Sequence, residues 1–402
     1  MLAAMVGIVG GMAAFLGLAF VLTDPVALGI GAVVAGGLVT GGLAHLLGRW
    51  FARNHRRCLT VSLGSLTALL LTVAGVVFLF RSPGFDEPNP VDRSWVRFES
   101  LTTGSRLACR VFSARTAVPR GAVIFVHGGP GANAVTNDPI AAALSPLADA
   151  GFDVCLYDQI GCGLSARLAN PEDYTAARQV VDLEILRQRL GWERPVLIGE
   201  SWGAQLIARY AAKYPQEISA AVLVSPGPLR LADWANRERG SARDRITDDQ
   251  ERAFNDVLDA RFVAAMLLLR VNPQAAFRFL PEAEAERYGA ALLTALSPGA
   301  VCNPDVLSAH SEPFLNLCVA QMIRLSLKNE LSDHLDGLVA AQFPVLVLRG
   351  DCDYANEGIA ADYVDAFPDA KLVAVAGAGH FLLLEKPESF LTEVRRFLAH
   401  QE

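Results

Sequence analysis

The chain has 402 residues, of which 52% are hydrophobic and only 19% are charged. Soluble domains carry roughly 25% charged residues, so this composition indicates that part of the chain lies outside water. The formal net charge of −7 argues against a nucleic-acid-binding protein, which would present a basic face. The apolar content excludes intrinsic disorder, and the length excludes a small disulfide scaffold.

Three long uncharged segments occupy residues 1–81, which we call the head. They run from Met1 to Thr23, from Pro25 to Gly48 and from Cys58 to Phe80. Each reaches the roughly 20 apolar residues that a helix needs to cross a bilayer. Because a backbone in lipid must satisfy its own hydrogen bonds, we expect three transmembrane helices. A cleaved signal peptide is the alternative for the first segment, although the basic region that begins such a peptide is missing.

The orientation of the head follows from the short loop at residues 49–57, which contains four arginines. Arginine-rich loops stay on the cytoplasmic side of the membrane. With three spans, the amino terminus then lies in the cytoplasm, and everything after Phe80 lies outside it. We therefore expect a multi-pass protein of the cell membrane with an extracytoplasmic globular domain.

The body, residues 95–402, follows a proline-rich polar linker at residues 82–94. Short apolar runs rich in β-branched residues alternate there with longer helical patterns. This alternation indicates an α/β fold with a mostly parallel sheet covered on both faces. Between about residues 228 and 338 helical patterns continue without a convincing strand, which predicts a helical lid inserted between two strands. The predicted strands are Leu107–Phe112, Ala122–Val126, Val154–Tyr157, Val196–Ile198, Ala221–Val224, Val345–Leu348 and Lys371–Val375.

The first motif in the body is HGGPG, residues 127–131, directly after a predicted strand. Glycines allow backbone N–H groups to turn toward a carbonyl oxygen that gains negative charge, and such an oxyanion hole needs two donors. We assign one donor to Gly129, with Gly128 as the alternative, and the other to Trp202. A plain turn is the alternative for the loop, and we expect His127 to brace it rather than act as a base.

The second motif is GESWG, residues 199–203, between the strand Val196–Ile198 and a predicted helix at Ala204–Lys213. In this context the pattern Gly-x-Ser-x-Gly is typical of a nucleophile elbow, a strained turn that projects the serine. Ser201 is therefore the candidate nucleophile. A serine that only caps the helix is the alternative.

A serine nucleophile needs a histidine base, and the base needs an acid that orients it. In this architecture the order along the chain is serine, acid, histidine. His380 follows the last predicted strand, at the strand end where sites form. Asp353 lies three residues after Gly350, the more usual spacing for the acid, and we prefer it to Asp351, which could instead bind N–H groups of its own loop.

These motifs, together with Asp158-Gln159-Ile160-Gly161-Cys162-Gly163-Leu164-Ser165, resemble the α/β-hydrolase superfamily, and most closely the proline iminopeptidase group of serine peptidases. The resemblance covers about residues 95–402. It implies Ser201 as nucleophile, His380 as general base, Asp353 as its partner and a lid that shapes the substrate pocket. It also implies an aminopeptidase. An esterase or lipase with the same triad is the alternative, and a catalytically inactive binding protein is the alternative from another class.

The chain departs from this group at two motif positions. Glu200 precedes the serine where the group commonly has glycine, and Ile160 stands where an arginine is usual. The lid of the group also supplies acids that hold the free amine of the substrate. No motif selects among the acids of this lid, so the substrate-binding residues stay unassigned; the candidates are Glu238, Glu282, Glu284, Glu286 and Glu312.

Six of the seven cysteines lie in the body, where an extracytoplasmic location would allow disulfides. The candidate pairs are Cys162 with Cys352 and Cys302 with Cys318. A sequence does not determine connectivity, so either pair could form. We expect no metal and no cofactor, since no Cys/His cluster has metal-site spacing and no phosphate-binding glycine loop follows the first strand. The expected partners are a peptide or small-molecule substrate and the lipid bilayer, without nucleic acid. The oligomeric state is left open.

Overall fold

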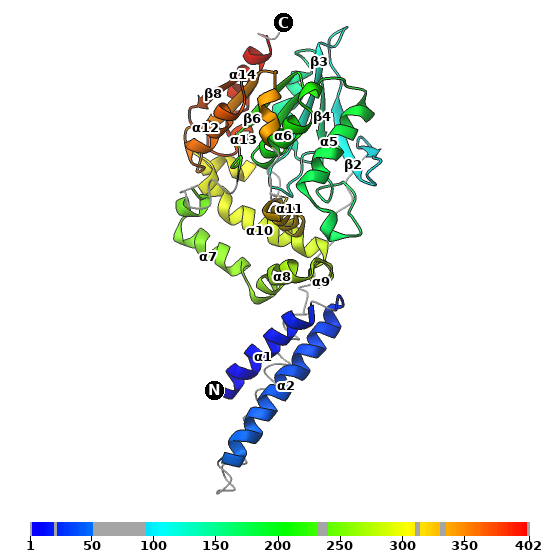
Figure 1. Cartoon of the computed structure of the whole chain (residues 1–402). Coiled ribbons are helices and arrows are strands. Elements are labelled where there is room, and N and C mark those ends of the chain that lie inside the picture. Colours follow the sequence, from blue (N-terminus) through cyan, green and yellow to red (C-terminus); the bar gives the residue numbers. More distant parts are fainter. Residues whose placement is uncertain are drawn as a thin grey trace. The chain divides into compact units, whose positions relative to one another are not determined.

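The computed structural model describes residues 2–19, 22–50, 94–230, 240–309, 314–329 and 335–399 (Figure 1). The chain divides into two compact units. The helical unit comprises Met1–Asn89 and Leu258–Glu284, and the sheet unit comprises Pro90–Val257 and Ala285–Glu402. Part of the predicted lid, residues 258–284, therefore groups with the head.

The helical unit begins with α1 (Leu2–Ala19) and α2 (Pro25–Trp50), which coincide with the first two predicted spans. Asp24 starts α2, since its side chain accepts a hydrogen bond of 2.8 Å from the N–H of Ala27. Leu28 and Ala32 of α2 are buried.

Two helices from the lid complete the helical unit, α8 (Ala260–Val271) and α9 (Pro273–Phe279). Asn272 links them to the head, because its Nδ2 donates to the carbonyl of Ala19 at 2.7 Å while its Oδ1 caps α9. The rings of Phe15 and Phe279 pack edge to face, with centroids 6.1 Å apart.

The three predicted transmembrane helices are not confirmed. In the described part of the chain, no helix has both the length and the apolar character needed to cross a bilayer. The third predicted span, Cys58–Phe80, and the linker up to residue 93 lie outside the described residues.

The sheet unit contains one eight-stranded sheet in the order β1-β2-β4-β3-β5-β6-β7-β8. The pairs β1–β2 and β2–β4 are antiparallel, and all other pairs are parallel. The mostly parallel sheet is thus confirmed, with β1 as an added strand that the sequence did not predict. The strands are β1 (Arg97–Ser100), β2 (Arg106–Phe112), β3 (Gly121–Val126), β4 (Phe152–Tyr157), β5 (Val196–Glu200), β6 (Ala220–Val224), β7 (Val345–Gly350) and β8 (Ala370–Val375).

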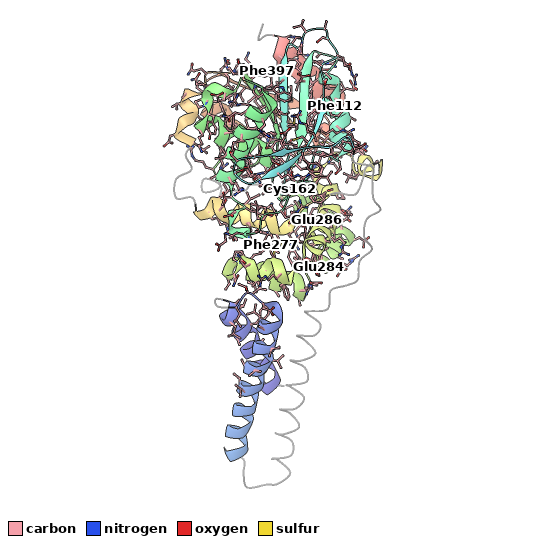
Figure 2. All side chains as sticks on the ribbon, turned by 90° about the vertical axis from the view of Figure 1, so that its right-hand side faces the viewer. Phe112, Cys162, Phe277, Glu284, Glu286 and Phe397 are labelled. Atoms are coloured by element: carbon pink, nitrogen blue, oxygen red, sulfur yellow. A yellow bond between two sulfur atoms is a disulfide. The ribbon has the colours of Figure 1, made fainter. Side chains whose placement is uncertain are left out.

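Helices cover both faces of this sheet because its central strands are apolar on both sides. Alternate residues such as Val123 and Phe125 point into one cluster with α4 (Asp138–Leu144), α13 (Leu382–Glu385) and α14 (Pro387–Ala399). Phe112 and Phe397 pack against this cluster (Figure 2). On the opposite face Gly199 of β5 contacts α6 (Trp202–Lys213), and α5 (Ala176–Leu190) packs on α6.

Between β6 and β7 the described residues form helices and no strand, as predicted for a lid. The helices of this insertion that belong to the sheet unit are α7 (Asp248–Val257), most of α10 (Glu282–Ala300) and α11 (Leu317–Asn329). The chain returns to the sheet at β7. A further helix, α12 (Glu357–Ala366), connects β7 with β8.

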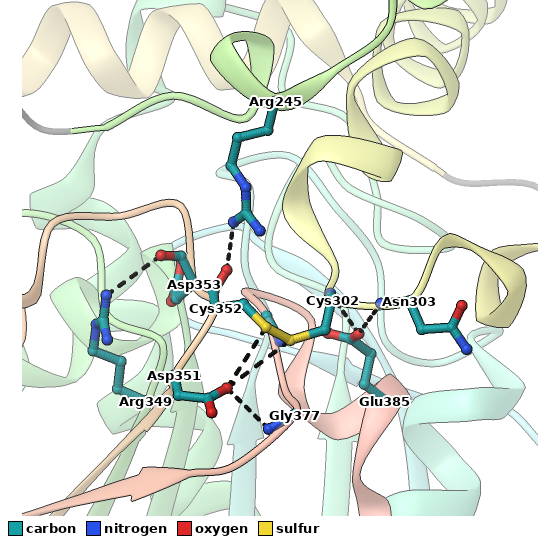
Figure 3. The surroundings of a disulfide bond; sticks show 10 residues. Arg245, Cys302, Asn303, Arg349, Asp351, Cys352, Asp353, Gly377 and Glu385 are labelled. Carbon is teal, nitrogen blue, oxygen red and sulfur yellow. Dashed lines mark hydrogen bonds between the residues drawn. A yellow bond between two sulfur atoms is a disulfide. The ribbon is translucent and has the colours of Figure 1, made fainter.

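A disulfide joins Cys302, after α10, to Cys352, after β7 (Figure 3). Neither candidate pair from the sequence forms, because Cys162 and Cys318 are buried free thiols. The two bonded cysteines are 50 residues apart, and only the packing of the lid against the end of β7 brings them together. Among the described residues, the group Cys302, Asp351 and Cys352 has the atom types of a metal site, but its sulfurs are already bonded to each other.

Candidate active site

Ser201 lies in a strained turn between β5 and α6. Its φ of +53° is in the left-handed region, which non-glycine residues rarely adopt. The turn is held because the N–H of Ser201 donates to the carbonyl of Val224 on β6 at 2.9 Å. A Cβ at Gly203 would lie 1.9 Å from the carbonyl oxygen of Val126, so only glycine lets α6 approach β3 this closely. This geometry is that of the predicted elbow.

The structure brings together the three residues predicted as a triad. His380 Nε2 lies 3.0 Å from Ser201 Oγ, and His380 Nδ1 lies 3.0 Å from Asp353 Oδ1. His380 and Asp353 are buried, with exposed fractions of 5% and 8%. The carboxylate of Asp353 can only accept a hydrogen bond, so the proton of the neutral imidazole lies on Nδ1. The other ring nitrogen, Nε2, is then free to accept the proton of the serine.

The buried pair is electrostatically coupled. Burial alone would raise the pKa of Asp353, but the charge and hydrogen bond of His380, with the N–H of Ala355, hold that pKa below its usual value. Burial alone would lower the pKa of His380, but Asp353 and then Glu200 outweigh it, so the pKa of His380 is raised. The imidazolium that would form during proton transfer is therefore stabilised.

The two competing aspartates have different partners. Asp351 contacts the backbone, because its Oδ1 accepts a hydrogen bond of 2.9 Å from the N–H of Gly377 (Figure 3). Asp353 contacts His380, and its Oδ1 also accepts from the N–H of Ala355 at 2.9 Å. The side chain of Arg349 donates to the carbonyl of Asp353 at 3.3 Å and supports the same loop.

Two residues of the site escaped the sequence analysis. Glu385 in α13 accepts hydrogen bonds from the N–H of Gly379 at 2.6 Å and from the N–H of Cys302 at 2.7 Å, which ties the His380 loop to the end of α10. The ring of Tyr354 packs on the imidazole of His380, with centroids 4.7 Å apart. No motif marks either residue, although Tyr354 directly follows Asp353 and Glu385 lies five residues after His380.

The HGGPG loop lies against the serine. A Cβ at Gly128 would lie 3.3 Å from Ser201 Cβ, so the loop backbone runs directly past the nucleophile position. No described residue accepts a hydrogen bond from the backbone N–H of Gly128, Gly129 or Trp202. The N–H groups of Gly129 and Trp202 are the two predicted donors of the oxyanion hole, and that of Gly128 is the alternative to Gly129.

His127 braces this loop, as expected. Its Nδ1 lies 3.0 Å from the carbonyl of Gly128, and its Nε2 accepts from the N–H of Gln159 at 3.0 Å. A ring that donates with one nitrogen and accepts with the other is neutral. Burial also lowers the pKa of His127, against the opposing effect of Asp158.

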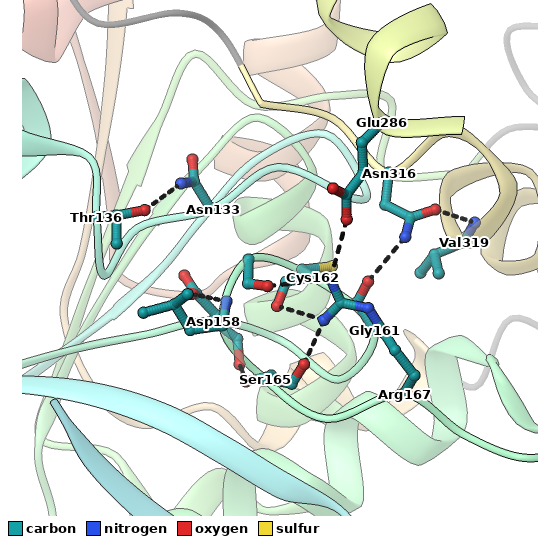
Figure 4. A network of polar contacts seen from close by, with 12 residues as sticks. Asn133, Thr136, Asp158, Gly161, Cys162, Ser165, Arg167, Glu286, Asn316 and Val319 are labelled. Atoms are coloured by element: carbon teal, nitrogen blue, oxygen red, sulfur yellow. Dashed lines mark hydrogen bonds and ion pairs between the residues drawn. The ribbon is translucent and has the colours of Figure 1, made fainter. Parts of the chain in front are cut away.

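The Asp158 motif is a structural clamp beside the site (Figure 4). Asp158 accepts hydrogen bonds from the N–H groups of Ala134, Val135 and Leu164 at 2.7–2.9 Å. Gln159 donates to the carbonyl of His127 at 2.8 Å and accepts from the indole of Trp202 at 3.0 Å. The motif therefore connects the HGGPG loop to the residue after the serine.

The three candidate lid acids that the structure describes already have partners. Glu286 forms an ion pair of 3.0 Å with Arg167 (Figure 4), and Glu284 forms a buried pair with Arg261. Glu282 also has a partner, whereas Glu238 and Glu312 lie outside the described residues.

Glu200 is the acid closest in sequence to the serine. Loss of contact with water raises its pKa to about 7, while the nearby charge of His380 lowers it. In the described part of the chain its carboxylate has no hydrogen-bond donor. The site thus contains, close to His380, a carboxyl group with a pKa of about 7. Proline iminopeptidases commonly have glycine at the position of Glu200.

Together these groups can transfer an acyl group. A serine hydroxyl faces a histidine oriented by an acid, and unpaired N–H groups lie beside it. The family model described as alpha/beta hydrolase fold matches residues 121–387.

Individual relatives support the same assignment. A proline iminopeptidase from Xylella fastidiosa (strain Temecula1) is 30% identical over 276 residues, covering 64% of this chain and 82% of that protein. The crystal structure of a proline iminopeptidase from Mycobacterium smegmatis shares 23% identity at a TM-score of 0.50, covering 76% of this chain and 98% of that one. An esterase structure from a Rhodococcus species shares 21% identity at a TM-score of 0.52, covering 77% of this chain and 100% of that one. The two structures show a common fold alone. The chain belongs to the alpha/beta hydrolase fold family.

Proposed function

We propose that the protein is a serine hydrolase that forms an acyl-enzyme on Ser201, and that it acts as an aminopeptidase. The observation that carries the proposal is the chain of contacts from Ser201 Oγ through His380 to Asp353, each about 3.0 Å long. The similarity to proline iminopeptidases supports the choice of a peptide substrate with a free amino terminus.

The reaction follows from this geometry. Ser201 Oγ attacks the carbonyl carbon of the scissile bond while its proton passes to His380 Nε2. The N–H groups of Gly129 and Trp202, or of Gly128 in place of Gly129, bind the oxyanion. The C–N bond then breaks as His380 returns the proton to the leaving amine. Water attacks the acyl-serine in the same way, and Ser201 regains its proton.

We propose further that the head anchors the sheet unit at the outer face of the cell membrane. The uncharged segments and the arginine loop support this location. The Cys302–Cys352 disulfide supports it too, since such bonds persist in oxidising compartments. In α2 the apolar side chains of Ile30, Val34 and Leu38 follow one another at helical spacing and are 54–71% exposed.

The first prediction concerns the triad. Ser201→Ala and His380→Ala should each lower kcat by roughly 10⁴- to 10⁶-fold, and the double variant should lose little more, because the residues act as one unit. Asp353→Asn should be severe. Asp351→Asn is the matched control and should be mild, since an asparagine oxygen can still accept from Gly377. Steady-state kinetics on a prolyl anilide measures all five variants, and reversed aspartate results would exclude Asp353 as the acid.

The second prediction concerns the substrate amine. N-acetylating a prolyl or alanyl amide should reduce kcat/KM by roughly 10- to 100-fold, because it removes a charge-assisted hydrogen bond. The blocked and free forms are compared with the same enzyme preparation, and labelling by a fluorophosphonate shows that the serine is active. Equal values, or turnover of acyl esters alone, would establish an esterase instead.

The third prediction concerns pH. The carboxylate of Glu200 stabilises protonated His380 and so raises its pKa. Only neutral His380 can accept the serine proton, so the rate of fluorophosphonate labelling should rise with pH through that pKa. Glu200→Gln removes the charge and should shift this rise to lower pH. Glu193→Gln, an exposed acid before β5, should leave the profile unchanged. A shift to higher pH in Glu200→Gln would contradict the electrostatic account.

The fourth prediction concerns topology. Protease added to intact cells or spheroplasts should digest the body, because an odd number of spans after a cytoplasmic amino terminus places the body outside. A cysteine introduced at Asn54 should react with an impermeant thiol reagent only after lysis. A body that resists protease until lysis, with Asn54 labelled from outside, would reverse the orientation.

A further inference from the structure

The carboxyl end of α10 supports the loop that carries His380. The backbone N–H of His380 itself donates to the carbonyl of Ala300 at 2.7 Å. Glu385 links the two segments a second time, because it accepts from the N–H of Gly379 at 2.6 Å and from that of Cys302 at 2.7 Å (Figure 3). A Cβ at Gly379 would lie 2.4 Å from the carbonyl oxygen of Ala300, so a larger residue has no room there.

The same end of α10 is attached to the loop that carries the catalytic acid, and here the link is covalent. Cys302 is bonded to Cys352, the residue directly before Asp353 (Figure 3). Their Cα atoms are 5.7 Å apart, a usual distance for a disulfide. A second contact comes from Arg245, whose side chain donates to the carbonyl of Cys352. The insertion between β6 and β7 therefore holds the acid loop at the residue next to the acid.

The position of Asp353 decides the geometry of the triad. Its two carboxylate oxygens lie 3.0 and 3.2 Å from His380 Nδ1. The acid loop also meets the histidine loop directly, because the N–H of Cys352 donates to the carbonyl of Ala378 at 3.0 Å. This contact is a single hydrogen bond, whereas the disulfide fixes Cys352 to the segment on which His380 rests. The end of α10 is thus a common support for both partners of the serine.

The disulfide is accessible to thiols, since Cys302 and Cys352 are each half-buried. A dithiol such as dithiothreitol reduces such a bond in two steps. One thiolate attacks a sulfur of the disulfide and forms a mixed disulfide, and the second thiolate then displaces the protein and closes a cyclic disulfide. The dithiol gives up two electrons and two protons, which leave Cys302 and Cys352 as thiols.

We propose that the Cys302–Cys352 disulfide positions Asp353 against His380, so that the enzyme has full activity only while this bond is oxidised. The inference rests on the proposed serine hydrolase function and holds for a peptide or an ester substrate alike. Reduction leaves the histidine loop attached to α10 by its hydrogen bonds but releases the acid loop from its covalent link. Because a misplacement of about 1 Å can cost roughly 100-fold in rate, even a small shift of Asp353 lowers turnover.

The experiment compares the full-length enzyme before and after treatment with dithiothreitol. The kcat on a prolyl anilide and the rate of fluorophosphonate labelling should both fall by roughly 10- to 100-fold, with KM little changed. Both should recover when the bond is reoxidised. Mass spectrometry after alkylation confirms that Cys302 and Cys352 have become thiols, and near-UV circular dichroism should show a retained fold.

The pH profile separates a positioning role from a loss of structure. Asp353 raises the pKa of His380, and Glu200 adds to this effect. When Asp353 moves away, the pKa of His380 falls, so the rise of the labelling rate with pH should move to lower pH in the reduced enzyme. A partly unfolded enzyme would instead lose the same fraction of its activity at every pH.

Variants give the same comparison without a reductant. Cys302→Ser and Cys352→Ser should each match the reduced wild-type enzyme and should not respond to dithiothreitol. Cys58→Ser is the matched control, since Cys58 lies outside the described residues, and it should respond as the wild type does.

Equal kcat and an equal pH profile in the oxidised and the fully reduced enzyme would overturn the inference while the proposed function stands. A loss of activity that only follows the unfolded fraction would overturn it too. A serine that reacts with the fluorophosphonate in neither form would overturn the proposed function, and this inference with it.

Discussion

The backbone strain at Ser201 is the constraint on which the site depends. A non-glycine residue in the left-handed region costs on the order of 1–3 kcal/mol and persists only where its surroundings hold it. Here the carbonyl of Val224 on β6 accepts a hydrogen bond from the N–H of Ser201. Helix α6 lies so close to β3 that a Cβ at Gly203 would lie 1.9 Å from the carbonyl oxygen of Val126. The same approach that strains the turn also places the serine beside the HGGPG loop and the end of β5. Strain and proximity therefore have one cause.

Carboxylates hold the loops that surround this turn. Asp158 binds three backbone N–H groups, Asp351 binds that of Gly377, and Glu385 binds those of Gly379, Cys302 and Asn303. Glycine-rich loops lose much conformational entropy on ordering, so such multiple acceptors offset a real cost. They leave the acid loop and the histidine loop fixed relative to each other. The Cys302–Cys352 disulfide adds a covalent link between the acid loop and the lid.

The charges around the histidine are arranged so that each has a distinct effect. Asp353 is hydrogen-bonded to His380, whereas Glu200 acts on it through space and titrates near pH 7 itself. Because the two groups interact, they titrate as a pair rather than independently. Of the lid acids, Glu286 and Glu284 are paired with arginines.

The sequence by itself determined the alternation of strands and helices, the position of the elbow at residues 199–203 and the candidate acids and base after β7 and β8. These features are local: strand periodicity, glycine at a tight turn and the place of a polar residue after a strand follow from a few neighbouring residues. It also named Asp351 and Asp353 as rivals, and only the folded loop separates them by their partners. The tertiary structure alone decided the Cys302–Cys352 pairing and the contacts of Glu385 and Tyr354, since each joins segments far apart in the chain. Such contacts depend on how the lid packs on the sheet, and no short pattern of residues encodes that packing.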